Sequence, residues 1–256
     1  MENFLPIALL FACLLALCEV GYWVGGQPRF RSEHQDKSRI ETILAQVMTL
    51  LALLLGFSVS IADNHHAARK QFAVDEANAI GTAFLRTKVV PEPEQKEIGK
   101  LLRHYAATRA SFYDLMPETQ AANDNLNLTK KIQTDLWDHA TLLGQTYPQL
   151  ITTGLLLDSL NRVMDIEESQ RAAFANGIPG SIIVLLAFGS IVGMSMVGFQ
   201  LGTSGSRYFV WTSLLALLLA STLFVVVDLD KSQQGFIRVH NESLDRLSIP
   251  ANDDHR

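Results

Sequence analysis

One apolar stretch of the sequence carries a row of small and polar side chains at helical spacing. Residues 43–62 contain no charged side chain, yet steps of three or four residues connect Gln46, Thr49, Leu53, Gly56, Ser60 and Asp63. Such steps place side chains on one face of a helix. In a membrane this face either packs against a neighbouring helix or lines a pore in which Leu53 is a hydrophobic constriction. Thr49, Leu53, Gly56 and Ser60 are therefore candidate pore-lining residues.

A second polar face follows downstream, within the segment 75–86. Asn78, Thr82 and Arg86 are four residues apart, so one side of a helix presents all three. Such groups could line a polar conduit or meet a partner subunit. The alternative is a solvated helix face closed by a cap or salt bridge. On the first interpretation, Asn78 and Arg86 join the candidate pore-lining residues, near a cytoplasmic mouth.

Two further features lie inside apolar stretches. Glu19 is the only ionisable residue well within one of them, and an intramembrane carboxylate is a candidate functional group. Because Glu19 is five residues from the end of its stretch, its side chain can also reach the interface as an anchor or ion-pair partner. Gly189 and Gly193 are four residues apart, as are Gly198 and Gly202, and this spacing predicts close helix packing.

The sequence offers little for catalysis, metals or nucleic acid. His65 and His66 are adjacent and point in different directions on a helix, and no second cluster supplies further ligands. Nucleophile-elbow, P-loop, dinucleotide-binding and paired-cysteine motifs are absent, so we expect no enzyme, cofactor or metal. Residues 64–177 carry 12 Lys/Arg and 14 Asp/Glu, a net charge of −2, which predicts no nucleic-acid partner.

The elements that must position these residues begin with four apolar stretches. They are Leu5–Val24, Ile43–Ala62, Ile178–Leu201 and Tyr208–Val227, of 20, 20, 24 and 20 residues. A helix needs about 20 apolar residues to cross a bilayer core. Apolar residues make up 48% of the 256-residue chain and charged residues only 18%. The sequence therefore predicts an all-α, polytopic integral membrane protein with four transmembrane helices in the lipid bilayer, and excludes a soluble protein.

The polar section between the second and third stretches predicts further helices. Residues 64–90 contain no proline, so one helix of about 80 Å, from Ser38 to Val90, continues the second membrane span. Pro91 and Pro93 end it and start the next helix, which Pro117 closes. Two more helices are predicted over residues 128–146 and 149–176.

This organisation predicts four segments: residues 1–63 with the first two membrane helices, a helical cytoplasmic region over 64–177, membrane helices over 178–227, and a cytoplasmic tail over 228–256. Four crossings place both termini and the middle section on one side. The distribution of Lys and Arg slightly favours the cytoplasm for that side. We therefore expect a multi-pass protein of the plasma membrane with cytoplasmic termini.

Four stretches together suggest a family. They are LLGFSVSI at 54–61, DEANAIGTAFLR at 75–86, LNRVMDIEESQRAAFANGIP at 160–179 and DLDKSQQGFIRV at 228–239. Their order and spacing resemble the bacterial bestrophin-like membrane proteins, a family of unknown function. The resemblance covers nearly the whole chain, from Glu19 to Leu247, and residues 75–86 are its most distinctive part.

The resemblance implies kinship to oligomeric anion channels with four membrane helices and a helical cytosolic region. True bestrophins also have a proline-rich aromatic neck and an acidic calcium clasp, and neither occurs here, so calcium gating is not implied. The first functional hypothesis is a homo-oligomeric channel for small anions, with the second membrane helix lining the pore. The alternative is a non-conducting sensor or scaffold whose cytoplasmic helices bind a partner.

Overall fold

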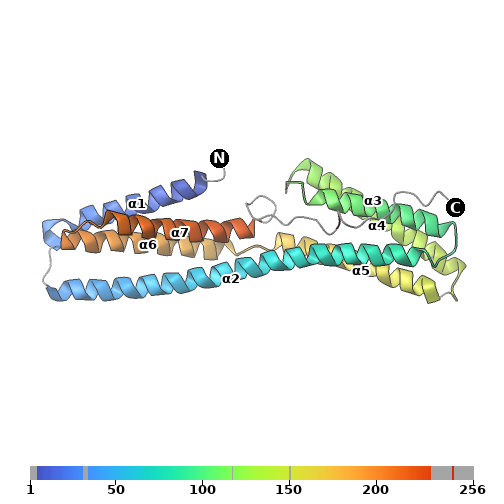
Figure 1. The fold of residues 1–256 in the computed structure, drawn as a ribbon, viewed down its shortest axis with the longest axis horizontal. Coiled ribbons are helices and arrows are strands. Elements are labelled where there is room, and N and C mark those ends of the chain that lie inside the picture. The colour runs from blue at the N-terminus through green and yellow to red at the C-terminus, as the bar shows by residue number, and fades with distance from the viewer. Residues whose placement is uncertain (1–4, 31–33, 117, 150, 232–243, 245–256) are drawn as a thin grey trace. The chain divides into compact units, whose positions relative to one another are not determined.

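The computed structural model describes residues 5–30, 34–116, 118–149, 151–231 and 244 (Figure 1). Its helices confirm the predicted all-α fold. In chain order they are α1 (Leu5–Gly25), the short 3-10 helix η2 (Pro28–Phe30), α2 (His34–Thr87), α3 (Glu94–Phe112), α4 (Gln120–Thr146), α5 (Ile151–Ala175), α6 (Gly180–Ser204) and α7 (Phe209–Asp230). The predicted cytoplasmic tail lies outside the described residues from residue 232 onward, except for Leu244.

Four helices in the described part of the chain are long and apolar enough to cross a membrane, as the four apolar stretches predict. They are α1, the first half of α2, α6 and α7. The long second helix is also confirmed: α2 is continuous over 54 residues and ends at Thr87, just before Pro91 and Pro93. Proline cannot continue a helix because it lacks the amide hydrogen and its ring clashes with the preceding turn.

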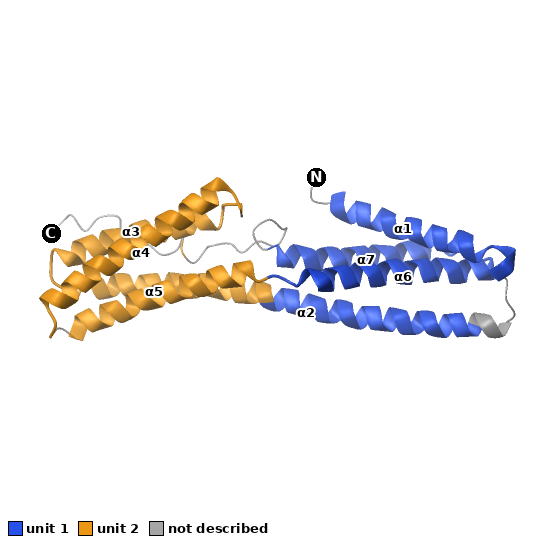
Figure 2. Ribbon diagram, turned by 180° about the vertical axis from the view of Figure 1, so that it is seen from behind, with its two compact units in different colours: residues 1–64, 177–231 blue, residues 65–176, 232–256 orange. Residues whose placement is uncertain are grey.

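The chain divides into two compact units (Figure 2). Residues 1–64 and 177–231 form one, which we call the membrane unit because it contains the four spanning segments. Residues 65–176 and 232–256 form the other, which we call the polar unit. Helix α2 contributes its first part to the membrane unit and its last part to the polar unit.

The membrane unit contains one very close helix contact, between α1 and α6. A Cβ atom on Gly198 would lie 1.9 Å from the backbone oxygen of Cys18, and one on Gly21 would lie 2.1 Å from that of Ser195. Gly25 and Gly202 are equally confined, at 2.2 Å from backbone oxygens. We call these four residues the glycine contact. Because only glycine fits at these distances, they allow the two backbones to touch.

Helix α2 packs in the membrane unit through larger side chains. Leu51 and Leu55 are buried in a cluster with Leu186 and Met194 of α6 and apolar residues of α1 and α7. Gly189 and Gly193, one of the two glycine pairs predicted to mediate packing, face side chains of α2: a Cβ on Gly189 would lie 3.1 Å from Leu51, and one on Gly193 would lie 3.0 Å from the Met48 sulfur. Both contacts are with side chains rather than with backbone.

In the polar unit an apolar core joins parts of α2, α3, α4 and α5. Its fully buried members include Ile80, Leu102, Leu136 and Leu160. The predicted apolar face of α3 is present, since Ile98, Leu102 and Tyr105 share this core. About eight residues of α4 were not predicted, because the helix begins at Gln120 rather than at Leu128. The hydroxyl of Thr119 accepts the Ala122 amide at 3.2 Å and caps this polar first part of the helix.

An exposed seam on α2 and a polar cavity between α2 and α5

The structure leaves the small and polar face of α2 uncovered in the membrane unit. Gln46, Thr49, Leu53, Gly56, Ser60 and Asp63, which we call the α2 seam, are all exposed. Leu53 is 54% exposed, and a Cβ added at Gly56 would meet nothing within 4 Å. The opposite face carries the buried Leu51, Leu55 and Ser58. Within the described part of one chain, the seam therefore takes no part in helix packing.

The seam has the chemistry of a surface that tolerates water. Thr49 donates its hydroxyl proton to the carbonyl oxygen of Ala45 at 2.8 Å, so its oxygen can still accept a bond from the exposed side. Beside the apolar Leu53, Gly56 has no side chain and Ser60 carries a small hydroxyl group. Such a surface suits either a second copy of the helix or a path for hydrated solutes.

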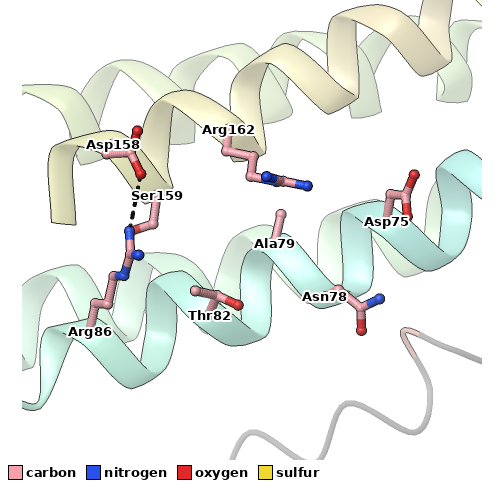
Figure 3. A pocket seen from close by; sticks show the side chains of 8 residues that line it. All are labelled: Asp75, Asn78, Ala79, Thr82, Arg86, Asp158, Ser159 and Arg162. Carbon is pink, nitrogen blue, oxygen red and sulfur yellow. Dashed lines mark hydrogen bonds and ion pairs between the residues drawn. The ribbon is translucent and has the colours of Figure 1, made fainter. Parts of the chain in front are cut away.

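In the polar unit, α2 and α5 enclose a cavity of about 230 Å³ (Figure 3). We call it the polar cavity, and its lining residues are Asp75, Asn78, Ala79, Thr82, Arg86, Asp158, Ser159 and Arg162. It brings together Asn78, Thr82 and Arg86, which the sequence places on one helix face. The α5 side was not predicted. Asp158 and Arg162 are four residues apart on α5, and that spacing was the available signal.

Arg86 is bound within this cavity. Its Nη1 donates to the carbonyl oxygen of Leu155 at 2.5 Å and to Oδ2 of Asp158 at 3.3 Å. The side chain of Asp158 is 77% exposed and that of Arg86 31%. This polar helix face therefore carries a salt bridge, which was one of the two alternatives for it. Asn78 and Thr82 remain exposed beside the salt bridge.

A buried charge network, which was not predicted from the sequence, lies in the core of the polar unit. Glu76 of α2, Arg109 of α3 and Gln170 of α5 have side chains that are almost completely buried. Arg109 Nε donates to Glu76 Oε1 at 2.5 Å, and Arg109 Nη2 donates to Gln170 Oε1. Gln170 Nε2 donates to the Tyr113 hydroxyl, which donates in turn to Glu76 Oε2 at 3.4 Å. The network therefore ties three helices together.

Electrostatics in this network favour the charged form of Arg109. Burial lowers the pKa of Arg109, but the charge and hydrogen bonds of Glu76 outweigh it and raise that pKa above its ordinary value. Burial, with the nearby Glu76 charge, also raises the pKa of Tyr113, so its hydroxyl stays protonated as a donor. Glu76 and Gln170 belong to two of the stretches that carry the family resemblance, which was the only sequence signal for them.

Glu19 has an ion-pair partner in the structure. Its Oε2 lies 3.5 Å from Nη2 of Arg207, in the connection between α6 and α7, and both side chains are more than half exposed. The Arg207 guanidinium also lies 4.4 Å from the centre of the Tyr22 ring. This placement agrees with the alternative of a paired group near the interface.

Metal-ligating side chains are not clustered in the described part of the chain. Among those residues, no group of three or more His, Cys, Asp and Glu side chains could hold a metal ion. His65 and His66 of α2 are half-buried.

Comparison with known proteins gives one family and one fold. A family model described as a Bestrophin-like domain matches residues 8–244. A crystal structure of a mutant bacterial Bestrophin homologue from Klebsiella pneumoniae superposes with a TM-score of 0.69, at 14% identity and 96% coverage of both chains. Another structure of the Klebsiella pneumoniae homologue gives 0.66 at 13% identity, covering 95% of each chain. No curated protein matches the sequence. The chain is an all-α membrane protein with four spanning helices, and it belongs to the bestrophin-like family.

Proposed function

We propose that this protein is a homo-oligomeric channel for small anions and that α2 lines its permeation path. The observation that carries the proposal is the α2 seam, which is small and polar, passes through a membrane-spanning segment, and is uncovered within the chain. Both helices expose large apolar side chains, such as Leu50 and Phe57 of α2, but the exposed side chains of α7 are apolar throughout and include Phe209, Trp211, Leu214 and Leu218. A surface of that kind suits lipid.

Oligomerisation is part of the proposal for a geometric reason. In a single chain the seam faces outward, where lipid would meet Thr49, Ser60 and the carboxylate of Asp63. Polar side chains that face lipid are costly, so such residues normally face other helices or water. Several copies arranged around an axis would turn each seam inward and enclose a polar path. Leu53 would then form its narrow apolar level.

Family membership supports a channel, and the proposed setting is the bacterial inner membrane. With four crossings, both termini and the polar unit lie on one side, which we propose is the cytoplasm. Arg86, Asn78 and the other residues of the polar cavity would then lie on the cytoplasmic side of the path.

Thiol modification in liposomes tests this assignment. In a background with Cys13 and Cys18 replaced, Ser60→Cys is compared with Leu218→Cys, which is 65% exposed on α7 in the native chain. A water-soluble, negatively charged thiol reagent should reduce anion flux through Ser60→Cys, because the reagent needs water and its charge would block the path. Leu218→Cys should not respond, since thiolates do not form in lipid.

Three results would count against the proposal. If the intact wild-type oligomer shows no flux, the non-conducting scaffold becomes the better hypothesis. If only Leu218→Cys responds, the channel stands but α2 does not line it. If the protein runs as a stable monomer that still conducts, the oligomeric part fails.

A further inference from the structure

The two arginines of the polar cavity are not equivalent. Nη1 of Arg86 donates to a backbone carbonyl and to Asp158, so the Arg86 charge is already paired. Arg162 has no hydrogen bond or ion pair with any residue in the described part of the chain, and it is exposed. In Figure 3 its guanidinium extends over Ala79, along the cavity and away from the Arg86–Asp158 pair. Arg162 therefore offers the one guanidinium of this cavity whose five donors and charge are all free of partners among the described residues.

Two neutral donors on α2 are also unused. Thr82 makes no hydrogen bond within the described residues, whereas Thr49, Thr108 and Ser169 each donate to a carbonyl four residues earlier in their helices. Asn78 is likewise without a partner there, and both residues line the cavity. Ser159, by contrast, donates to the carbonyl of Leu156 at 2.8 Å. Residues with unused donors on two helices thus line one cavity.

We propose that the polar cavity binds a small, singly charged anion between Arg162 of α5 and Thr82 and Asn78 of α2. Arg162, rather than Arg86, supplies the attracting charge. The inference deepens the proposed channel function, because it assigns an anion site to particular residues. It does not depend on conduction, since binding can be measured directly.

The size and charge of the cavity set the ligand class. A water molecule occupies about 30 Å³ in the liquid, so 230 Å³ holds a halide-sized ion with several waters of hydration. The Asp158 charge is offset by Arg86, which leaves Arg162 opposed by Asp75. Arg162 has no carboxylate within ion-pair distance in the described part of the chain, so its one charge can balance one negative charge but not two.

Chloride binding to the purified full-length oligomer in detergent tests the site, with the line width of the chloride NMR signal as readout. Arg162→Gln should weaken binding by about tenfold, because a charged hydrogen-bond donor is lost. The matched control is Arg171→Gln, which removes the same charge from the same helix at a position paired with Glu168. Asp75→Asn should instead tighten binding, because it removes the opposing carboxylate.

The results separate the site from the channel. Equal chloride affinity in wild type and Arg162→Gln, or no chloride binding by wild type, overturns the site even if liposome flux is present. Loss of binding in Arg162→Gln without any wild-type flux supports the site and counts against the channel. If Arg162→Gln fails to fold, Asp75→Asn alone decides, since unchanged or weaker binding in that variant contradicts the proposal.

Discussion

The membrane unit and the polar unit are both made of helices, but different contacts hold them together. In the membrane unit, four glycines let the backbones of α1 and α6 touch. In the polar unit, Leu, Ile and Tyr side chains fill the core, and a buried ion pair joins α2 to α3. The difference follows from the surroundings. Water drives apolar side chains into a core, whereas lipid is as apolar as leucine and helices there associate through close packing.

The comparison also explains where polar side chains occur. The polar unit can bury Glu76 because Arg109 and Tyr113 donate hydrogen bonds to its carboxylate, while Gln170 bonds to both of these donors. A buried charge is tolerable when its hydrogen bonds are satisfied in this way. The membrane unit buries few polar side chains, and Ser58 and Ser190 bond to carbonyls of their own helices. By contrast, the polar groups of the α2 seam are exposed, so in a membrane they need a second helix or water beside them.

The largest expected effect is all-or-none and concerns the side of the membrane on which the polar unit lies. In a background lacking Cys13 and Cys18, a membrane-impermeant thiol reagent applied outside intact cells should label Arg29→Cys and leave Gln120→Cys unlabelled. Arg29 lies between two spanning helices, whereas Gln120 begins α4 of the polar unit. Permeabilised cells provide the control, because both positions should then react. Labelling of Gln120→Cys alone in intact cells would invert the proposed topology.

The next largest effect is expected at the glycine contact. Gly198→Ala places a Cβ 1.9 Å from a backbone oxygen, so α1 and α6 must separate and the membrane unit should fail to fold. Yield and size-exclusion profile in detergent measure this. Gly180→Ala is the matched control on the same helix, because nothing lies within 4 Å of its added Cβ. Normal yield of Gly198→Ala would mean that the helices are farther apart than described.

Gly193→Leu extends the same test to the pair that the sequence singled out. The nearest neighbour of an added Cβ at Gly193 is the Met48 sulfur at 3.0 Å, which can move more easily than backbone. We expect Gly193→Leu to disrupt folding or assembly, because a whole leucine side chain exceeds that space, and Gly193→Ala to be milder than Gly198→Ala. Unchanged yield and oligomer size of Gly193→Leu would exclude a close contact there.

In the polar unit the corresponding test is the buried ion pair. Arg109→Met leaves the Glu76 carboxylate buried without its cation and should lower the free energy of unfolding by about 3–5 kcal/mol. Chemical denaturation followed by circular dichroism measures this. Adding Glu76→Gln to the same chain should recover part of the loss. Arg171→Gln, at an exposed pair, is the control, and an equal loss in that variant would contradict the importance of burial.

The sequence predicted the elements well and their partners poorly, for physical reasons. Runs of about 20 apolar residues and the prolines at 91, 93 and 117 mark helix ends locally, so the spans and α2 could be derived. The start of α4 was missed because its first eight residues are polar and lack an apolar period. The glycine spacing of α6 was seen, but nothing in it identifies Gly21 and Gly25 of α1 as the partners.

The same limit applies to the candidate site. The face of Asn78, Thr82 and Arg86 follows from helical spacing alone. Arg86 can bind Asp158, 72 residues away, only because α5 packs against α2. The pair of Glu76 with Arg109 spans 33 residues and is equally non-local. Local periodicity therefore predicts which side chains share a face, and tertiary packing decides which of them remain available.

The smallest effect is expected at Glu19, where the sequence left two interpretations open. The carboxylate lies 3.5 Å from the Arg207 guanidinium with both groups more than half exposed, and exposed ion pairs contribute little to stability. Glu19→Gln should therefore change the melting temperature in detergent by less than about 2 °C and leave anion flux close to wild type.

Arg207→Gln provides the comparison for Glu19→Gln, because it removes the other half of the same pair. The Arg207 guanidinium also stacks on Tyr22, so this variant loses a cation–π contact as well and should be the more destabilised of the two. A functional carboxylate predicts a different result: flux would fall in Glu19→Gln while the melting temperature stayed constant, and Arg207→Gln would not reproduce that fall. Measuring both quantities in both variants therefore decides whether Glu19 anchors the end of α1 or acts on the permeating ion.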